Sequence, residues 1–240
     1  MEKTYQEKKW YNYFNTIRNK YNMRVSPKKP LVIFLNAKDV TKNKSINLID
    51  NSKDSFLDVA QKTVKYFTKK YNCLAIFALD EVNFIFKDAQ SIIDEINNDK
   101  TYRTQDIASV FSQYFYEYFN NLNKNDQIYW YCKCYSIPED KISSYIKYKN
   151  RTILKGVTTY FLNKNLIKNS WQMKLEEKIK LCNSNENYEK IKPFEEGILY
   201  LEGDKIDIKQ YLNGKKANLN QESKEENEKY FDLKMFDDLL

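Results

Sequence analysis

Short apolar runs separated by turn residues predict the strands of a sheet in the first part of the chain. Residues 31–35 (LVIFL) form an uninterrupted apolar run, which is typical of a buried central strand. Residues 74–77 and 82–86 flank Leu79-Asp80-Glu81, and this pattern predicts two strands joined by a tight turn. Residues 127–135 alternate between apolar and polar positions and predict a fourth strand.

Apolar residues at helical spacing fill most of the sequence between and after these strands. The stretches with this spacing are residues 4–22, 56–67, 89–97, 103–119 and 173–181. Asp54 is the expected N-cap of the second stretch. Pro138 opens a further helical stretch to about residue 162, which we expect to be interrupted near Lys149-Asn150 or at Gly156.

The order of the predicted elements through residue 135 is strand, helix, strand, strand, helix, strand. This order predicts an α+β fold of the ferredoxin-like or palm type, a split βαβ with an antiparallel sheet and added helices. In this topology the hairpin between the second and third strands lies next to the end of the first strand. Asn36, at that end, is therefore expected to lie near Asp80 and Glu81.

The remaining sequence gives weaker signals. Residues 197–208 predict a second hairpin, and residues 213–229 are almost wholly polar, which is typical of a flexible segment. We predict four parts, which are an N-terminal helix and linker (1–30), a palm-like domain (31–165), a helix-and-hairpin appendage (166–212) and a flexible polar tail (213–240).

The absence of histidine restricts the chemistry that the chain can perform. It removes the commonest general base, the commonest zinc ligand and every Ser-His or Cys-His nucleophile. Carboxylates, Lys, Tyr, Cys or a hard cation bound by oxygen ligands remain. The four cysteines form no Cys-x-x-Cys pair, so we expect buried, reduced thiols and no zinc site.

Charge and hydropathy indicate the environment of the protein. No apolar run approaches the ~18 residues of a membrane span, and the N-terminal residues lack the apolar core of a signal peptide. We therefore expect a cytoplasmic protein without membrane contact. The net charge of +7 and the 20 tyrosines have their simplest explanation in an AT-rich genome, although a basic aromatic surface for phosphate-rich ligands is compatible with them.

Four motifs connect the Asp80-Glu81 hairpin to one enzyme family. Residues 36–41 (NAKDVT) follow the first strand, where the family has Asp-Gly-Arg-x-Phe-His, and Leu79-Asp80-Glu81 matches its Ser-Asp-Glu hairpin. Residues 103–112 (RTQDIASVFS) resemble its Arg-x-x-Lys-x-x-Ser-x-x-Ser helix, and residues 145–150 (YIKYKN) its Tyr-Phe-x-Trp-Arg-Gln helix. In this way the chain resembles the tRNA-His guanylyltransferase family, whose members add nucleotides in the 3′-to-5′ direction.

The resemblance implies a divergent palm nucleotidyltransferase that adds a nucleotide from a nucleoside triphosphate to the 5′ end of tRNA or a similar RNA. It implies Mg²⁺ or Mn²⁺ as cofactor, Asp80 and Glu81 as catalytic carboxylates, and a homodimer or homotetramer. The implied metal ligands are Asn36, Ala37 (through its backbone carbonyl) and Asp80. The implied nucleotide-binding residues are Lys38, Asp39, Val40, Thr41, Arg103, Ser109 and Lys149.

Several positions depart from the family pattern. Asn36 stands where the family has its first metal-binding aspartate, so one negative charge is missing and weaker or single-metal binding is expected. Ala37, Lys38 and Thr41 replace the Gly, Arg and His of the same motif. These changes leave two alternatives open, a catalytically impaired descendant that binds RNA or nucleotide or serves in assembly, and a palm that makes a small nucleotide product.

Two groups of side chains have two interpretations each. The tyrosines of the fourth strand, Tyr129, Tyr131 and Tyr135, are either a base-stacking platform or, more simply, aromatics covered by a helix. The cations at 147, 149, 151 and 155 are either a phosphate-binding stripe or a solvated helix face.

Overall fold

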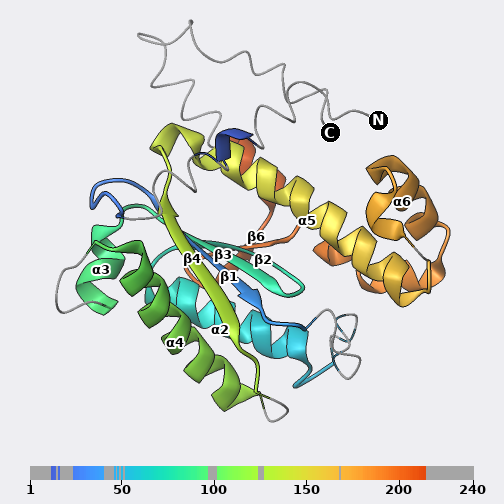
Figure 1. Ribbon diagram of the computed structural model, residues 1–240, viewed down its shortest axis with the longest axis horizontal. Helices are drawn as coiled ribbons and strands as arrows, with labels where there is room; N and C mark the ends of the chain where they lie inside the picture. The colour runs from blue at the N-terminus through green and yellow to red at the C-terminus, as the bar shows by residue number, and fades with distance from the viewer. Residues whose placement is uncertain are drawn as a thin grey trace, which may run out of the picture.

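The fold is known from a computed structural model of the chain, drawn in Figure 1. It describes residues 12–14, 16, 24–40, 46, 48, 50, 52–96, 102–123, 127–167 and 169–214. Residues 12–14 and 16 are helical, in agreement with the helix predicted for residues 4–22. Three predicted parts lie outside the described residues. They are most of that helix, the site residue Thr41, and residues 215–240 of the predicted tail.

The strands form one antiparallel sheet in the described part of the chain. They are β1 (Leu31–Ala37), β2 (Leu74–Ala78), β3 (Glu81–Phe86), β4 (Trp130–Ser136), β5 (Ile198–Leu201) and β6 (Asp204–Ile206). Their order across the sheet is β4-β1-β3-β2-β5-β6. The first four strands have the predicted split βαβ order, and the predicted hairpin of residues 197–208 adds β5 and β6 beside β2.

Helices cover both faces of this sheet, as Figure 1 shows. They are α2 (Phe56–Lys70), α3 (Gln90–Ile96), α4 (Thr104–Leu122), α5 (Ile142–Lys164) and α6 (Leu175–Asn183). α2 and α4 pack on one face, and α5 crosses the other. The α+β fold with an antiparallel sheet and added helices is therefore confirmed. None of the helices in the described ranges has both the length and the apolar character needed to cross a membrane.

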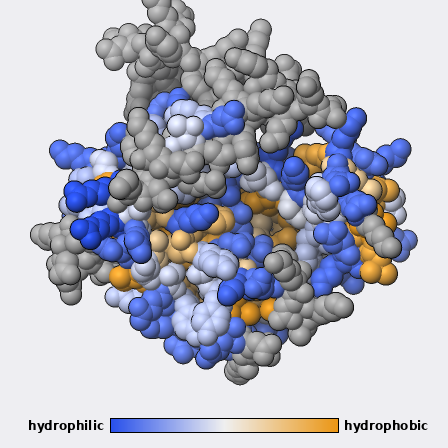
Figure 2. All heavy atoms as spheres, viewed as in Figure 1, coloured by the Kyte–Doolittle hydropathy of each residue, from blue (hydrophilic) through white to orange (hydrophobic). Residues whose placement is uncertain are grey.

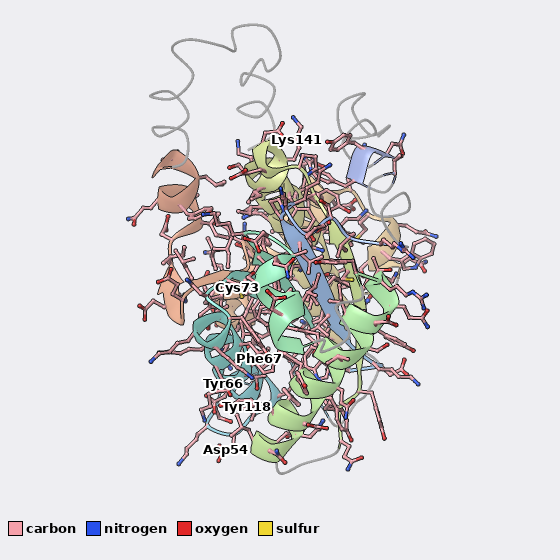
Figure 3. The ribbon with its side chains drawn as sticks, turned by 90° about the vertical axis from the view of Figure 1, so that its left-hand side faces the viewer. Asp54, Tyr66, Phe67, Cys73, Tyr118 and Lys141 are labelled. Carbon is pink, nitrogen blue, oxygen red and sulfur yellow. The ribbon has the colours of Figure 1, made fainter. Side chains whose placement is uncertain are left out.

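Phe67 is at the centre of the core between α2, α4 and the sheet. Its ring centre lies 5.5 Å from that of Phe111 and 5.2 Å from that of Phe115, both on α4, and 6.1 Å from that of Phe84 on β3. These distances are typical of favourable aromatic packing. Figure 3 shows Phe67 beside Tyr66 and Tyr118, at the junction of α2 and α4. The helical spacing in the sequence thus corresponds to the buried face of each helix.

Two details of the helices differ from the predictions. The N-cap of α2 is Ser55, whose hydroxyl accepts from the backbone N–H of Asp58, whereas Asp54 lies one residue earlier with φ of 64°. α5 is continuous through Lys149 and Gly156, so the predicted interruption is wrong. Lys149 is buried and paired rather than solvated, and a single exposed glycine lowers helix stability by only about 1 kcal/mol.

Figure 2 shows apolar surface at the right-hand edge of this view, where α6 and the end of α5 lie in Figure 1, and in smaller groups near the centre and the lower edge. Leu166 is 86% exposed and Trp171 is 65% exposed in this region. Most of the remaining surface in this view is polar, in keeping with the high lysine content of the sequence.

Candidate active site

The end of β1 and the tip of the β2–β3 hairpin lie side by side, as the topology predicted (Figure 1). Asn36 is opposite Glu81 in the β1–β3 register. The backbone N–H of Ala37 donates to the carbonyl oxygen of Asp80 at 2.8 Å, and the Asn36 side-chain amide donates to the same oxygen at 3.2 Å. These two hydrogen bonds fix Asp80 beside the end of β1.

The hairpin turn is formed by Leu79 and Asp80 alone, between the last residue of β2 and the first of β3. Leu79 has φ of 50°, a left-handed conformation that costs a non-glycine residue about 1–2 kcal/mol. Its side chain is buried, so core packing offsets part of this cost. Backbone strain of this kind is concentrated at functional sites, where the surrounding structure over-determines the conformation.

The environment of Asp80 changes its acidity. Burial raises the pKa of the Asp80 carboxyl to about 6, and the negative charge of Glu81 acts in the same direction. A hydrogen bond from its own backbone N–H, and one from the amide of Asn36, lower this pKa in part. At neutral pH the group is mostly ionised, and a bound cation would stabilise that charge.

Glu81 is already neutralised by a lysine. Lys149, on α5, is only 7% exposed and forms an ion pair with the carboxylate of Glu81. The side-chain amide of Asn83 donates to the same carboxylate oxygen at 2.7 Å. The Lys149 ammonium also lies 5.0 Å from the ring centre of Phe34, within cation–π distance. Lys149 therefore faces the sheet and does not belong to a solvated face of α5, the simpler of the two interpretations given to its four cations.

A chain of buried hydrogen bonds extends from Glu81 beneath α5. The fully buried Asn83 accepts from the Tyr145 hydroxyl at 2.8 Å, and the hydroxyls of Tyr145 and Tyr135 are 2.7 Å apart. These hydrogen-bonded residues were not among the site residues predicted from the sequence. The available signal was Asn83, a lone polar residue inside the apolar run 82–86, because buried polar groups require a partner.

Asp80 is the carboxylate at the hairpin that remains available to a cation. Within the described ranges, no residue forms an ion pair with Asp80, whereas Glu81 is paired with Lys149. No group of three or more His, Cys, Asp or Glu side chains in the described residues could hold a metal. Mg²⁺ usually binds through one or two carboxylates plus substrate phosphates and water. Asp80 supplies one such carboxylate, and the Asn36 amide beside it donates its N–H group to Asp80.

The turn after β1 contains the predicted triphosphate-binding residues. Lys38 is exposed, and its backbone N–H donates to the carbonyl of Tyr129 at 2.7 Å, so its ammonium is the group left to contact a phosphate. Asp39 is exposed with φ of 56°, and Val40 is buried in the core. The predicted contribution of Thr41 lies outside the described residues.

Arg103 and Ser109 lie in another part of the fold, away from the hairpin site. Both belong to the α4 region, on the sheet face opposite α5, and both are exposed. Arg103 forms an isolated β-bridge with Arg24, which precedes the opposite end of β1. The structure thus brings together Asn36, Ala37, Lys38, Asp80, Glu81 and Lys149, and it leaves Arg103 and Ser109 elsewhere.

The sequence matches no protein-family model and no curated protein, but the fold matches solved structures. A bacterial tRNA(His) guanylyltransferase-like protein in complex with ATP is 15% identical, with a TM-score of 0.56 over 79% of this chain and 83% of that one. A similar bacterial protein in complex with GTP is 16% identical, with a TM-score of 0.53 over 79% of this chain and 83% of that one.

The tRNA(His) guanylyltransferase of Saccharomyces cerevisiae is 18% identical, with a TM-score of 0.53 over 80% of this chain and 94% of that one. This chain has the fold of the tRNA-His guanylyltransferases. The similarity extends over nearly all of the yeast protein. The fold predicted from the motif resemblance is thus confirmed, including the position of the hairpin that carries Asp80.

Proposed function

We propose that the chain is a divergent 3′-5′ nucleotidyltransferase that adds a nucleotide from a triphosphate to the 5′ end of tRNA or a similar RNA. The observation that carries this proposal is the position of Asp80, in the β2–β3 turn beside the end of β1 of a guanylyltransferase fold. No cation of the described residues forms an ion pair with its carboxylate. The proteins of the same fold that bind ATP and GTP support a triphosphate as the substrate.

The proposed chemistry requires no histidine. Phosphoryl transfer depends mainly on positioning and on charge compensation. Asp80, with Asn36 and the carbonyl of Ala37, would bind one Mg²⁺ or Mn²⁺, which when bound neutralises phosphate charge and makes an attacking oxygen more acidic. Lys38 would contact the phosphates through its exposed ammonium. Glu81 and Lys149 would fix the hairpin and so orient Asp80, rather than bind the metal themselves.

Two observations favour the alternative of an impaired descendant that binds RNA or nucleotide, or serves in assembly. Asn36 carries no charge, and Lys149 neutralises Glu81, so Asp80 is the one carboxylate left at the hairpin. Two divalent cations would need more negative charge than this. This alternative keeps nucleotide binding and predicts no transfer.

Labelled triphosphates distinguish these functions. The protein is incubated with labelled ATP or GTP and with Mg²⁺ or Mn²⁺, in the presence and absence of tRNA. Label in the RNA supports the proposal, label in a small product supports a signalling-type cyclase, and binding without transfer supports the impaired descendant. Asp80→Ala should abolish transfer while the fold remains intact by circular dichroism, and Asp204→Ala, an exposed carboxylate on β6, should retain transfer. Unchanged transfer by Asp80→Ala would exclude this site.

A further inference from the structure

Tyr131 is an exposed aromatic side chain next to the candidate site. It lies directly opposite Asn36 in the β1–β4 register, and it is 56% exposed. Residues opposite one another in antiparallel strands have Cβ atoms about 4.5–5.5 Å apart. More than half of the Tyr131 side chain therefore remains in contact with water, on a strand at the edge of the sheet.

The two other tyrosines considered with it, Tyr135 on β4 and Tyr129 just before β4, have aromatic partners. Tyr135 is 7% exposed and lies under α5, where its hydroxyl contacts that of Tyr145. Tyr129 is stacked on Tyr116, with ring centres 5.3 Å apart and 21° between the planes. Of the two interpretations given to these residues, a covering helix is thus correct for Tyr135. In the described part of the chain, no aromatic ring stacks on Tyr131.

Two lysines lie near Tyr131 in the fold. The Lys38 ammonium lies over its ring, 6.0 Å from the ring centre. Lys133, two residues further along the same strand face, is also exposed. An exposed aromatic ring combined with cations is the chemistry that recognises a nucleotide, because the ring stacks on a base and the ammonium pairs with phosphate.

We propose that Tyr131 is the stacking surface for the base of the nucleoside triphosphate, while Lys38 contacts its phosphates. This inference rests on the proposed function, because it assigns the base to the same site as the triphosphate. Every base has a π-face, so stacking tolerates different bases. Tyr131 therefore contributes affinity and little discrimination between ATP and GTP.

Calorimetry with two ligands tests the proposal on the full chain with Mg²⁺. One ligand is ATP, and the other is inorganic tripolyphosphate, which has the phosphates but no base. Tyr131→Ala should weaken ATP binding by about tenfold and leave tripolyphosphate binding unchanged. Tyr131→Phe should retain the affinity for ATP. Tyr114→Ala, which removes a 39% exposed tyrosine on α4, should match the wild type for both ligands.

Each contrary outcome has a distinct meaning. If Tyr131→Ala binds ATP as tightly as the wild type does, or if it weakens only RNA binding, Tyr131 is not the base-stacking surface. Equal weakening of ATP and tripolyphosphate also overturns the proposal, because the defect would then concern phosphate binding. If the wild type binds ATP but the Tyr131 variants do not differ from it, the proposed function remains. If the wild type binds neither ligand, both proposals fail.

Discussion

Asn36 limits the negative charge at the end of β1. Its side-chain amide donates to Asp80, whereas an aspartate at this position would add a carboxylate beside another carboxylate. We expect Asn36→Asp to raise Mn²⁺ affinity by about tenfold or more, because each added negative charge attracts a divalent cation at short range. Without a cation the two carboxylates repel, so the same variant should be less stable than the wild type in chelator.

Titration with Mn²⁺, followed by electron paramagnetic resonance, measures the affinity and the number of bound ions. Asn72→Asp is a matched control, because Asn72 is exposed in the turn before β2, at the end of that strand away from the hairpin. It makes the same charge change and should leave Mn²⁺ binding unaltered. An identical response from the two variants would show that Asn36 is not close to a metal position.

The half-buried carboxyl of Asp80 makes stability depend on pH. Its pKa is about 6 in the folded protein and 3.8 in its ordinary state. Below pH 3.8 both folded and unfolded states hold the proton, so the group contributes nothing. Between these values the unfolded state loses the proton first, and above pH 6 the folded state carries the full penalty. We expect Asp80→Asn to stabilise the metal-free protein by up to about 3 kcal/mol above pH 6.

Urea unfolding in chelator at pH 4.5 and at pH 7.5 measures this effect. The advantage of Asp80→Asn should be small at the lower pH and larger at the higher one. A pH-independent difference between the variant and the wild type would show that Asp80 titrates normally in the folded protein.

Part of this site could be predicted from the sequence, and part could not. The proximity of Asn36 to Asp80 and Glu81 was predictable, because the strand order places the hairpin beside the end of β1. The Glu81–Lys149 ion pair was not, because Lys149 comes from a distant part of the sequence and only the packing of α5 joins the two. In the sequence, a buried paired lysine looks the same as a solvated one.

At the scale of elements, α5 is attached to the sheet by charge as well as by apolar packing. The Glu81–Lys149 pair lies between α5 and β3, and few of its atoms reach solvent. We expect Lys149→Met to lower the free energy of unfolding by about 3 kcal/mol, because it leaves a partly buried carboxylate without its partner. Glu81→Gln in the same chain should recover much of that loss.

A double-mutant cycle in urea measures the interaction between these two residues. Lys192→Met is the control, because Lys192 pairs with Glu189 in an exposed i,i+3 arrangement that should contribute less than about 1 kcal/mol. Additive effects of Lys149→Met and Glu81→Gln would mean that the pair is not a coupled unit.

The elements themselves were largely predictable from periodicity, and the exceptions have specific causes. The strands and helices through β4 follow apolar spacing, which depends on local sequence. The continuity of α5 was missed because Lys149-Asn150 reads as a polar break, although Lys149 is buried through its ion pair. The hairpin of β5 and β6 was predicted, but its attachment to β2 was not, because strand partners distant in sequence leave no local signal.

At the scale of the whole molecule, Gly197 lies where β5, β2 and α5 pack closely together. It precedes β5, and a Cβ there would lie 2.9 Å from Cγ2 of Ile76 on β2 and 3.0 Å from Cδ1 of Ile153 on α5. Its φ of 74° also favours glycine. We expect Gly197→Ala to lower the free energy of unfolding by about 2–4 kcal/mol, through steric overlap and backbone strain together.

Gly156→Ala is the matched control for this substitution. Gly156 lies inside α5 with φ outside the left-handed region, and a Cβ added there would meet no atom within 4 Å. Alanine should therefore stabilise the helix by about 0.5–1 kcal/mol. The two variants make the same chemical change with opposite expected signs. A loss of stability in both would indicate that packing around α5, rather than the Gly197 junction, controls the result.

Hydrogen exchange then shows whether the β5–β6 hairpin and the palm sheet unfold together. β5 is hydrogen-bonded to β2, which continues through β3 to β1 and the candidate site. If these strands form one cooperative unit, Gly197→Ala should reduce amide protection in β1 and β3 as much as in β5. Lower protection confined to β5 and β6 would instead mean that the β5–β6 hairpin opens separately. The end of β1 would then hold Asp80 in place without the β5–β6 hairpin.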